Sequence, residues 1–206
     1  MKKGVEIIDV NNLLNDNIID PIQYQYYKNL KDRRIIINNE INDDIIEMAV
    51  LPLREMDSDG SGKPIEIILN TIGGSVYDGF QLISIIENLK TPTTIIVAGK
   101  AISMGALIAM AGKNNPNVKT ICSPYSVFLI HSGSDCMAGT VNMIKDTFHF
   151  SEKYEKIIED YVVSHSKIST DLYLKKSRYE WWFTAPEALE LGVVDEIMST
   201  THHLAP

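Results

Sequence analysis

Three short segments of the sequence carry residue types that could together hydrolyse an acyl bond. Gly73 and Gly74 follow an apolar run, Ser103 opens a stretch of small residues, and His131 ends a second apolar run. Paired glycines allow backbone angles closed to other residues and can leave N–H groups free to hold a developing oxyanion. A serine with histidine as its general base is a common nucleophile for acyl transfer.

Each of these residues also has a purely structural explanation, which taken singly is the favoured one. The glycine pair could form a plain turn, Ser103 could cap the helix expected to follow it, and His131 could hydrogen-bond to backbone at the edge of the core. Cys136 lies five residues past His131. A Cys–His pair is conceivable there, but a structural cysteine is the better interpretation.

The elements that must position these residues alternate between strand and helix, which predicts an α/β fold with largely parallel strands. Expected strands cover residues 33–41, 65–70 and 93–99, with shorter apolar runs at 121–123 and 126–132. Expected helices cover residues 43–56 and 75–90 and a segment from about Ser103. The glycine pair, the serine and the histidine would all stand at strand ends, where α/β folds place their sites.

A long helix is expected over residues 140–164, because apolar side chains recur there at helical spacing. At 1.5 Å per residue it would be on the order of 35 Å long, comparable to the diameter of a small domain. It could project, with its apolar stripe needing a partner outside its own domain, or lie across the domain. The periodicity of this segment is compatible with both arrangements.

The composition indicates a soluble globular protein, because 45% of the 206 residues are hydrophobic and 22% are charged. The net charge of −8 argues against nucleic acid as a partner. Two cysteines cannot make a disulfide framework, and no apolar run follows the first lysines, so we expect a cytoplasmic protein without a signal peptide. The longest apolar stretch, 101–112, is too short to cross a membrane.

We expect neither a cofactor nor a metal. The loop at residues 57–64 lacks the first glycine and the final Ser or Thr of a phosphate-binding loop, and it lacks the last ligand of a calcium loop. No dinucleotide fingerprint follows a strand, and the histidines lack metal-ligand spacing apart from the adjacent pair 202–203.

In their order along the chain, the glycine pair, the segment AISMGA, the strand-end histidine and APEALELGVVD resemble the Clp protease proteolytic subunit family. The resemblance runs from about residue 30 to residue 197. It implies a crotonase-like α/β fold of repeated strand-strand-helix units with a projecting handle helix. Residues 1–29 are crowded with Asn, Asp, Ile and Tyr without a clear period, which indicates an N-terminal arm or an irregular helix before a single peptidase domain, 30–206.

The resemblance implies site roles and an activity. Ser103 would be the nucleophile, His131 its base, and Gly74 and Met104 the oxyanion-hole amides. The family's third catalytic residue is an aspartate, and Glu180 stands in its place in SRYEWWFTAPEA. Glu180 could orient the histidine, although its extra methylene moves the carboxylate outward; it could also be a solvated surface group. Asp171 is the fallback acid.

The resemblance also implies partners. It implies polypeptide substrates and self-association into heptameric rings that the long helix interlocks into a hollow barrel. In the family, aromatic residues on the strand before the glycine turn help an ATP-driven unfoldase to dock, whereas this chain has Glu66 and Ile68 there. TIGG also replaces the usual SPGG, and the N-terminal arm is unlike the family's. A specialised unfoldase or none therefore stays open, and such divergence would suit a phage-encoded or accessory relative.

The leading hypothesis is a serine endopeptidase that cleaves peptide bonds inside a ring chamber, with the processing of capsid scaffolds as a variant. An alternative is a catalytically silent structural or regulatory ring subunit that lost efficient chemistry through the change to Glu180. A third hypothesis is an acyl-CoA enzyme of the broader crotonase fold, which would leave the order of serine, histidine and acid a coincidence.

Overall fold

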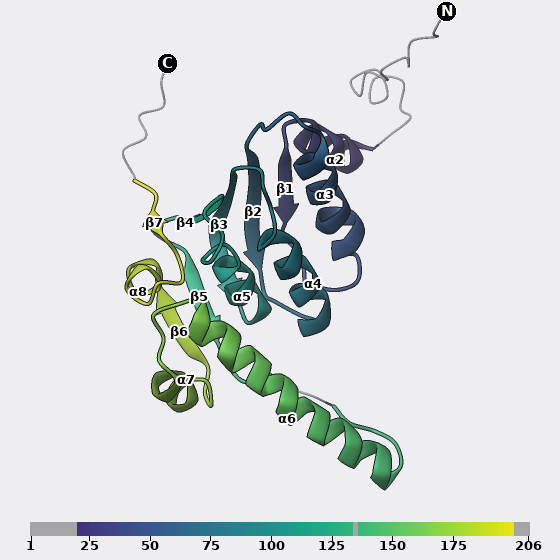
Figure 1. Ribbon diagram of the computed structural model, residues 1–206, viewed down its shortest axis with the longest axis vertical. Helices are drawn as coiled ribbons and strands as arrows, with labels where there is room; N and C mark the ends of the chain where they lie inside the picture. Colours follow the sequence, from purple (N-terminus) through teal and green to yellow (C-terminus); the bar gives the residue numbers. More distant parts are fainter. Residues whose placement is uncertain (1–19, 134–135, 200–206) are drawn as a thin grey trace, which may run out of the picture.

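A computed structural model describes residues 20–133 and 136–199, and a largely parallel sheet forms its centre (Figure 1). The strands are β1 (Arg34–Ile37), β2 (Ile65–Thr71), β3 (Thr93–Ile102), β4 (Val118–Cys122), β5 (Val127–Ile130), β6 (Trp181–Thr184) and β7 (Glu196–Ile197). They run in the order β1-β2-β3-β4-β7, all parallel, while β5 pairs in parallel with the end of β3. Strand β6 pairs antiparallel with β5. The predicted α/β class is confirmed.

Most helices pack against the sheet, and one projects from it (Figure 1). They are α2 (Pro21–Lys31), η1 (Ile46–Val50), α3 (Leu51–Ser58), α4 (Val76–Ile86), α5 (Met104–Met110), α6 (Val141–Ser164), α7 (Thr170–Lys176) and α8 (Ala185–Glu190). Figure 1 shows α3, α4 and α5 packed along β1, β2 and β3. Side chains on β2 alternate strictly between buried and half-buried, as expected of a strand with one face in the core. The buried face belongs to one continuous apolar core.

The helix expected over residues 43–56 forms in two parts. Its first part, η1, is π-helical, and α3 then continues to Ser58. Pro52 stands at the start of α3 and has no N–H with which to continue a regular helical ladder. We attribute the wide turn before it to that missing donor, because π-helical turns mark places where the regular ladder is interrupted.

Other boundaries also differ from the sequence expectation, and β1 ends at Ile37 rather than at residue 41. Helix α4 ends at Ile86 rather than at residue 90, because the side-chain amide of Asn115 donates to the carbonyls of Ile86, Glu87 and Leu89. Strand β3 continues past Gly99 to Ile102, because β5 supplies a second partner there, with Ile102 opposite Leu129.

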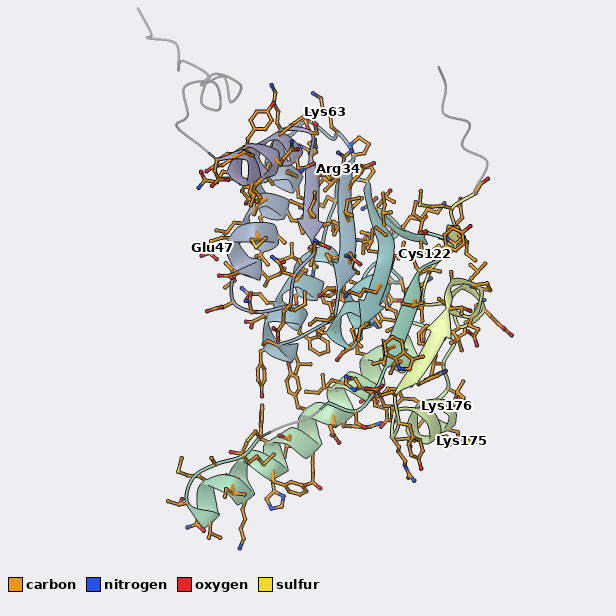
Figure 2. All side chains as sticks on the ribbon, turned by 180° about the vertical axis from the view of Figure 1, so that it is seen from behind. Arg34, Glu47, Lys63, Cys122, Lys175 and Lys176 are labelled. Carbon is orange, nitrogen blue, oxygen red and sulfur yellow. The ribbon has the colours of Figure 1, made fainter. Side chains whose placement is uncertain are left out.

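The long helix predicted over 140–164 is confirmed as α6, with Thr140 as its N-cap. Its C-terminal part is anchored in the body, where the Tyr161 hydroxyl donates to the carbonyl of Leu107 over 3.0 Å. The remainder extends away from the sheet (Figures 1 and 2), although the Tyr154 ring still contacts those of Tyr77 and Phe80, with centroids 5.0 and 6.0 Å away. Phe148 is 51% exposed and Phe150 50%. The projecting alternative is therefore the correct one.

The predicted arm falls partly outside the described residues, as do residues 200–206. Of the arm, residues 21–29 belong to α2, which Asp20 caps through the backbone N–H groups of Ile22 and Gln23. In the part of the chain that the structure describes, no helix is both long and apolar enough to cross a bilayer.

Candidate active site

Ser103 sits on a sharp turn between β3 and α5. Its φ of 55° and ψ of −120° lie in a region that side chains other than glycine rarely adopt. Backbone hydrogen bonds fix the turn on both sides, since its N–H donates to the carbonyl of Leu129 and its own carbonyl accepts from Ala106. The side chain makes no capping bond to α5. Strain of this kind is found where a serine is presented as a nucleophile.

Helix α5 supports this turn from within the core, because all of its residues are buried. Its first turn packs closely on β2: a side chain added to Gly105 would begin 2.7 Å from Cγ2 of Thr71. The small residues of this segment therefore let the helix approach the sheet. They place the start of α5 directly behind the glycine turn that follows β2.

His131 lies within hydrogen-bonding distance of Ser103. Its Nε2 is 2.9 Å from the Ser103 Oγ. The two residues are 28 positions apart in the chain and meet because β5 returns beside the end of β3, so that both follow neighbouring strands. The sequence prediction that these two side chains could pair is thus met by the geometry.

The glycine turn has no room for side chains. Gly73 and Gly74 have φ values of 87° and 145°, and a side chain on Gly73 would begin 2.9 Å from both the amide nitrogen of Met104 and Cβ of Ser103. Ile41 holds the turn from outside, because its N–H donates to Gly73 and its carbonyl accepts from Ser75. Within the described residues, the N–H groups of Gly74 and Met104 have no hydrogen-bond acceptor. Both amides flank the serine and are available for an anionic oxygen.

Thr71 connects the elements around this turn, and sequence reasoning missed it. The side chain is 1% exposed, its Oγ1 donates to the carbonyl of Asn39 over 2.5 Å, and it accepts the N–H of Gly73 over 3.1 Å. Its methyl group faces Gly105. The alternation of β2 places residue 71 on the buried face, which is the signal that could have identified it.

Glu180 lies next to His131 by register but is bonded elsewhere. The antiparallel pairing ends with Ile130 opposite Trp181, so His131 follows the last pair on β5 and Glu180 precedes it on β6. The Glu180 carboxylate is exposed and accepts the indole N–H of Trp182 over 3.1 Å. Asp171 is exposed in the first turn of α7. In the described part of the chain, neither acid is hydrogen-bonded to His131.

These residues line one pocket of about 450 Å³. Its wall contains Ser103, His131, the glycine turn, Met104 and Glu180, together with Glu40, Tyr173 and several aliphatic side chains. Burial, with a smaller contribution from the carboxylates of Glu155 and Glu159, raises the pKa of Tyr173 to about 12, so the phenol is neutral at physiological pH. Among the described residues, no three His, Cys, Asp or Glu side chains gather closely enough to hold a metal ion.

Comparison with known proteins points to one family. The family model described as Clp protease matches residues 20–201. The ATP-dependent Clp protease proteolytic subunit of Porphyromonas gingivalis is 30% identical over 169 residues, covering 82% of this chain and 75% of the relative. The subunit of the same name from Bacteroides fragilis is 28% identical over 187 residues, covering 90% and 89%. That of Streptococcus sanguinis is 29% identical over 180 residues, covering 86% and 90%.

Proposed function

The chain belongs to the Clp protease family, and from that premise we propose that it is a serine endopeptidase that cleaves polypeptides within a self-assembled ring. One observation carries the proposal: the Ser103 Oγ lies 2.9 Å from Nε2 of His131, on a strained turn flanked by two free amides. A strained serine in contact with an imidazole and two unpaired N–H groups is the arrangement that acyl transfer requires.

In the proposed reaction His131 accepts the hydroxyl proton of Ser103 at Nε2 while Oγ attacks the peptide carbonyl carbon. The carbonyl oxygen becomes negative and takes hydrogen bonds from the N–H groups of Gly74 and Met104. His131 then gives the proton to the departing amine. Water enters, loses a proton to His131 and releases the acid from Ser103, which regains its hydroxyl group.

Glu180 is the proposed third member of the triad, because it directly precedes β6 where His131 directly follows β5, and both residues line the same pocket. To orient the imidazole, its carboxylate would leave the indole of Trp182 and accept the N–H at Nδ1 of His131. Asp171 is the less favoured acid, since it does not line the pocket.

We further propose ring assembly through α6, because apolar side chains on its projecting part are exposed, and an ATP-driven partner, because the relatives are named ATP-dependent proteolytic subunits. Strand β2 corresponds to the strand whose aromatic residues help the unfoldase to dock in the family, but its side chains differ in chemistry here. Glu66 forms an ion pair with Arg34 at 2.9 Å, with Ile68 one step along the same face. An unfoldase that docks there would have to accept charge beside an aliphatic side chain.

A silent ring subunit is the second candidate. It is favoured by the exposed position of Glu180 and its hydrogen bond to Trp182, because a histidine without an orienting carboxylate is a much weaker base. In this case the fold and the rings would form normally, and the serine would not be activated.

Covalent labelling with a fluorophosphonate, read by intact mass, tests both candidates. We expect a single adduct on the assembled protein and none on Ser103→Ala. In Glu180→Gln the labelling rate should fall by about a hundredfold or more, since loss of the orienting carboxylate costs about 10⁴ in other serine hydrolases. An unlabelled protein that forms rings would instead establish the silent subunit. Full peptide cleavage by Ser103→Ala would disprove the assignment of the nucleophile.

A further inference from the structure

The carboxylates in the wall of the pocket that contains Ser103 and His131 give this wall a negative charge. Its described lining includes two carboxylates, Glu40 and Glu180, and no Lys or Arg. Glu180 has a partner in the indole of Trp182. Glu40 forms no ion pair with any described residue. An unpaired carboxylate therefore stands in the wall of the proposed catalytic pocket.

The backbone on both sides of Glu40 is fixed to the glycine turn. The carbonyl of Asn39 accepts the Thr71 hydroxyl, and Ile41 is hydrogen-bonded to both Gly73 and Ser75. Cγ of Glu40 lies 2.9 Å from the point at which a side chain on Gly74 would begin. The backbone of Glu40 is thus fixed beside the amide that would bind the oxyanion, and its side chain is exposed at the pocket wall.

A negative charge at this place opposes the reaction of a neutral substrate. The developing oxyanion would be repelled by Glu40, and a bound peptide that covers the pocket would strengthen this repulsion by displacing water. A cationic side chain on the substrate would pair with Glu40 and remove that repulsion. The same carboxylate would then strengthen the binding of this substrate and stabilise its transition state.

We propose that Glu40 selects peptides that carry a lysine or arginine close to the scissile bond. This inference rests on the proposed endopeptidase function and adds the substrate class. The wall also contains aliphatic side chains, Leu107, Leu129 and Ile158 among them, and the aromatic rings of Tyr173 and Trp182. The pocket thus suits an apolar side chain next to the cation. The preferred substrate therefore has one apolar and one basic residue side by side near the scissile bond.

The test uses the full-length assembled protein and internally quenched peptides that share one leucine-containing core. Lysine is moved stepwise through the positions around the leucine, and each peptide is compared with its glutamine counterpart. At one of these positions we expect kcat/KM to be about three- to fivefold higher with lysine, as for a partly exposed ion pair. The preference should shrink at high ionic strength. Mass spectrometry of the products locates the bond that is cleaved.

Glu40→Gln is the decisive variant and Glu47→Gln its matched control. Both remove one negative charge, but Glu47 is exposed on η1 and projects away from the body (Figure 2). Glu40→Gln should abolish the lysine preference and accelerate cleavage of the glutamine peptides, whereas Glu47→Gln should retain the preference. Equal rates for lysine and glutamine at every position, or a preference that survives in Glu40→Gln, would overturn the proposal.

Labelling of Ser103 separates this proposal from the function on which it rests. Peptidyl phosphonates with a basic or a neutral side chain are compared on wild type and on Glu40→Gln, and the faster reaction of the basic probe should depend on Glu40. If Ser103 reacts equally with both, only the selectivity is wrong. If Ser103 reacts with neither, the endopeptidase function fails, and the selectivity fails with it.

Discussion

At the scale of single residues, the site depends on side chains that hold the backbone as much as on those that would react. Thr71 is the clearest case, because one hydroxyl joins the carbonyl of Asn39 to the N–H of Gly73. Both contacts lie behind the turn that presents the Gly74 amide. Thr71 would not touch a substrate, so we describe it as a positioning residue.

Replacing Thr71 with valine keeps the shape of the side chain and removes its hydroxyl. We expect kcat to fall about tenfold with KM changed less than twofold, because a buried N–H without a partner costs about 1–3 kcal/mol and loosens the turn. Steady-state kinetics measure the two constants separately.

Thr71→Ser is the matched control, since it retains the hydroxyl and loses only the methyl group that faces Gly105. It should restore kcat to within about threefold of wild type, in keeping with the small cost of one methyl group. Circular dichroism melting confirms that both variants fold. An unchanged kcat in Thr71→Val would show that the turn needs no such support.

At the scale of elements, one carboxylate on α3 holds the loop that leads from α4 into β3. Oδ1 of Asp57 accepts the N–H groups of Lys90 and Thr91 over 2.9 and 2.8 Å. Partial burial opposes the charge, but the hydrogen bonds from Thr91 and Lys90 prevail and hold the pKa of Asp57 below its ordinary value. Asp57 thereby stabilises the fold while it is ionised.

The pH dependence follows from the direction of this shift. A carboxylate whose pKa is lower in the folded state stabilises fully above its unfolded pKa, which is about 4, and loses that contribution as pH falls through the folded value. Asp57→Asn should therefore unfold about 1 kcal/mol more easily at neutral pH. The difference from wild type should narrow below about pH 4. Urea unfolding at several pH values measures it, with the exposed Asp43→Asn as control. A difference that is constant down to acid pH would contradict the assignment.

The sequence predicted the main elements, because buried and exposed positions alternate or recur with clear periods. It could not predict where β3 ends, since the pairing with β5 that extends it to Ile102 is a long-range contact. The π-helical turn before Pro52 and the early end of α4 also depend on particular hydrogen bonds. Neither leaves a periodic signal in the chain.

The candidate site was predictable in part. Ser103 and His131 follow strands and could be singled out by type and position. Their separation of 2.9 Å and the φ of 55° at Ser103 arise from the return of β5 beside β3. Glu40 and Thr71 precede the site in the chain. The alternation of β2 marks residue 71 as buried, but no local pattern gives either residue a role at the site.

At the scale of the whole molecule, α6 leaves apolar side chains uncovered. Val141, Ile144 and Phe148 recur at helical spacing and are 68%, 38% and 51% exposed. A set of exposed apolar side chains on one projecting element is typical of a surface that another protein covers. In the proposed ring assembly a second copy of the chain would cover it.

Phe148→Asp should convert the assembly to smaller species at equal protein concentration, because association would then bury an unpaired charge. Asn142→Asp, on the same exposed segment, adds the same charge without removing an apolar side chain and should leave the mass unchanged. Analytical ultracentrifugation distinguishes the species. If Phe148→Asp keeps the wild-type mass, α6 does not form the interface.

The two ends of α6 are subject to different selective demands. Tyr161 and Val162 are fitted to the interior of their own subunit, so a change there must be matched by changes in the core. The projecting half has to match only what it meets outside. Two such genes carried by one cell could therefore diverge along that half, keep their assemblies separate, and retain the same machinery around Ser103.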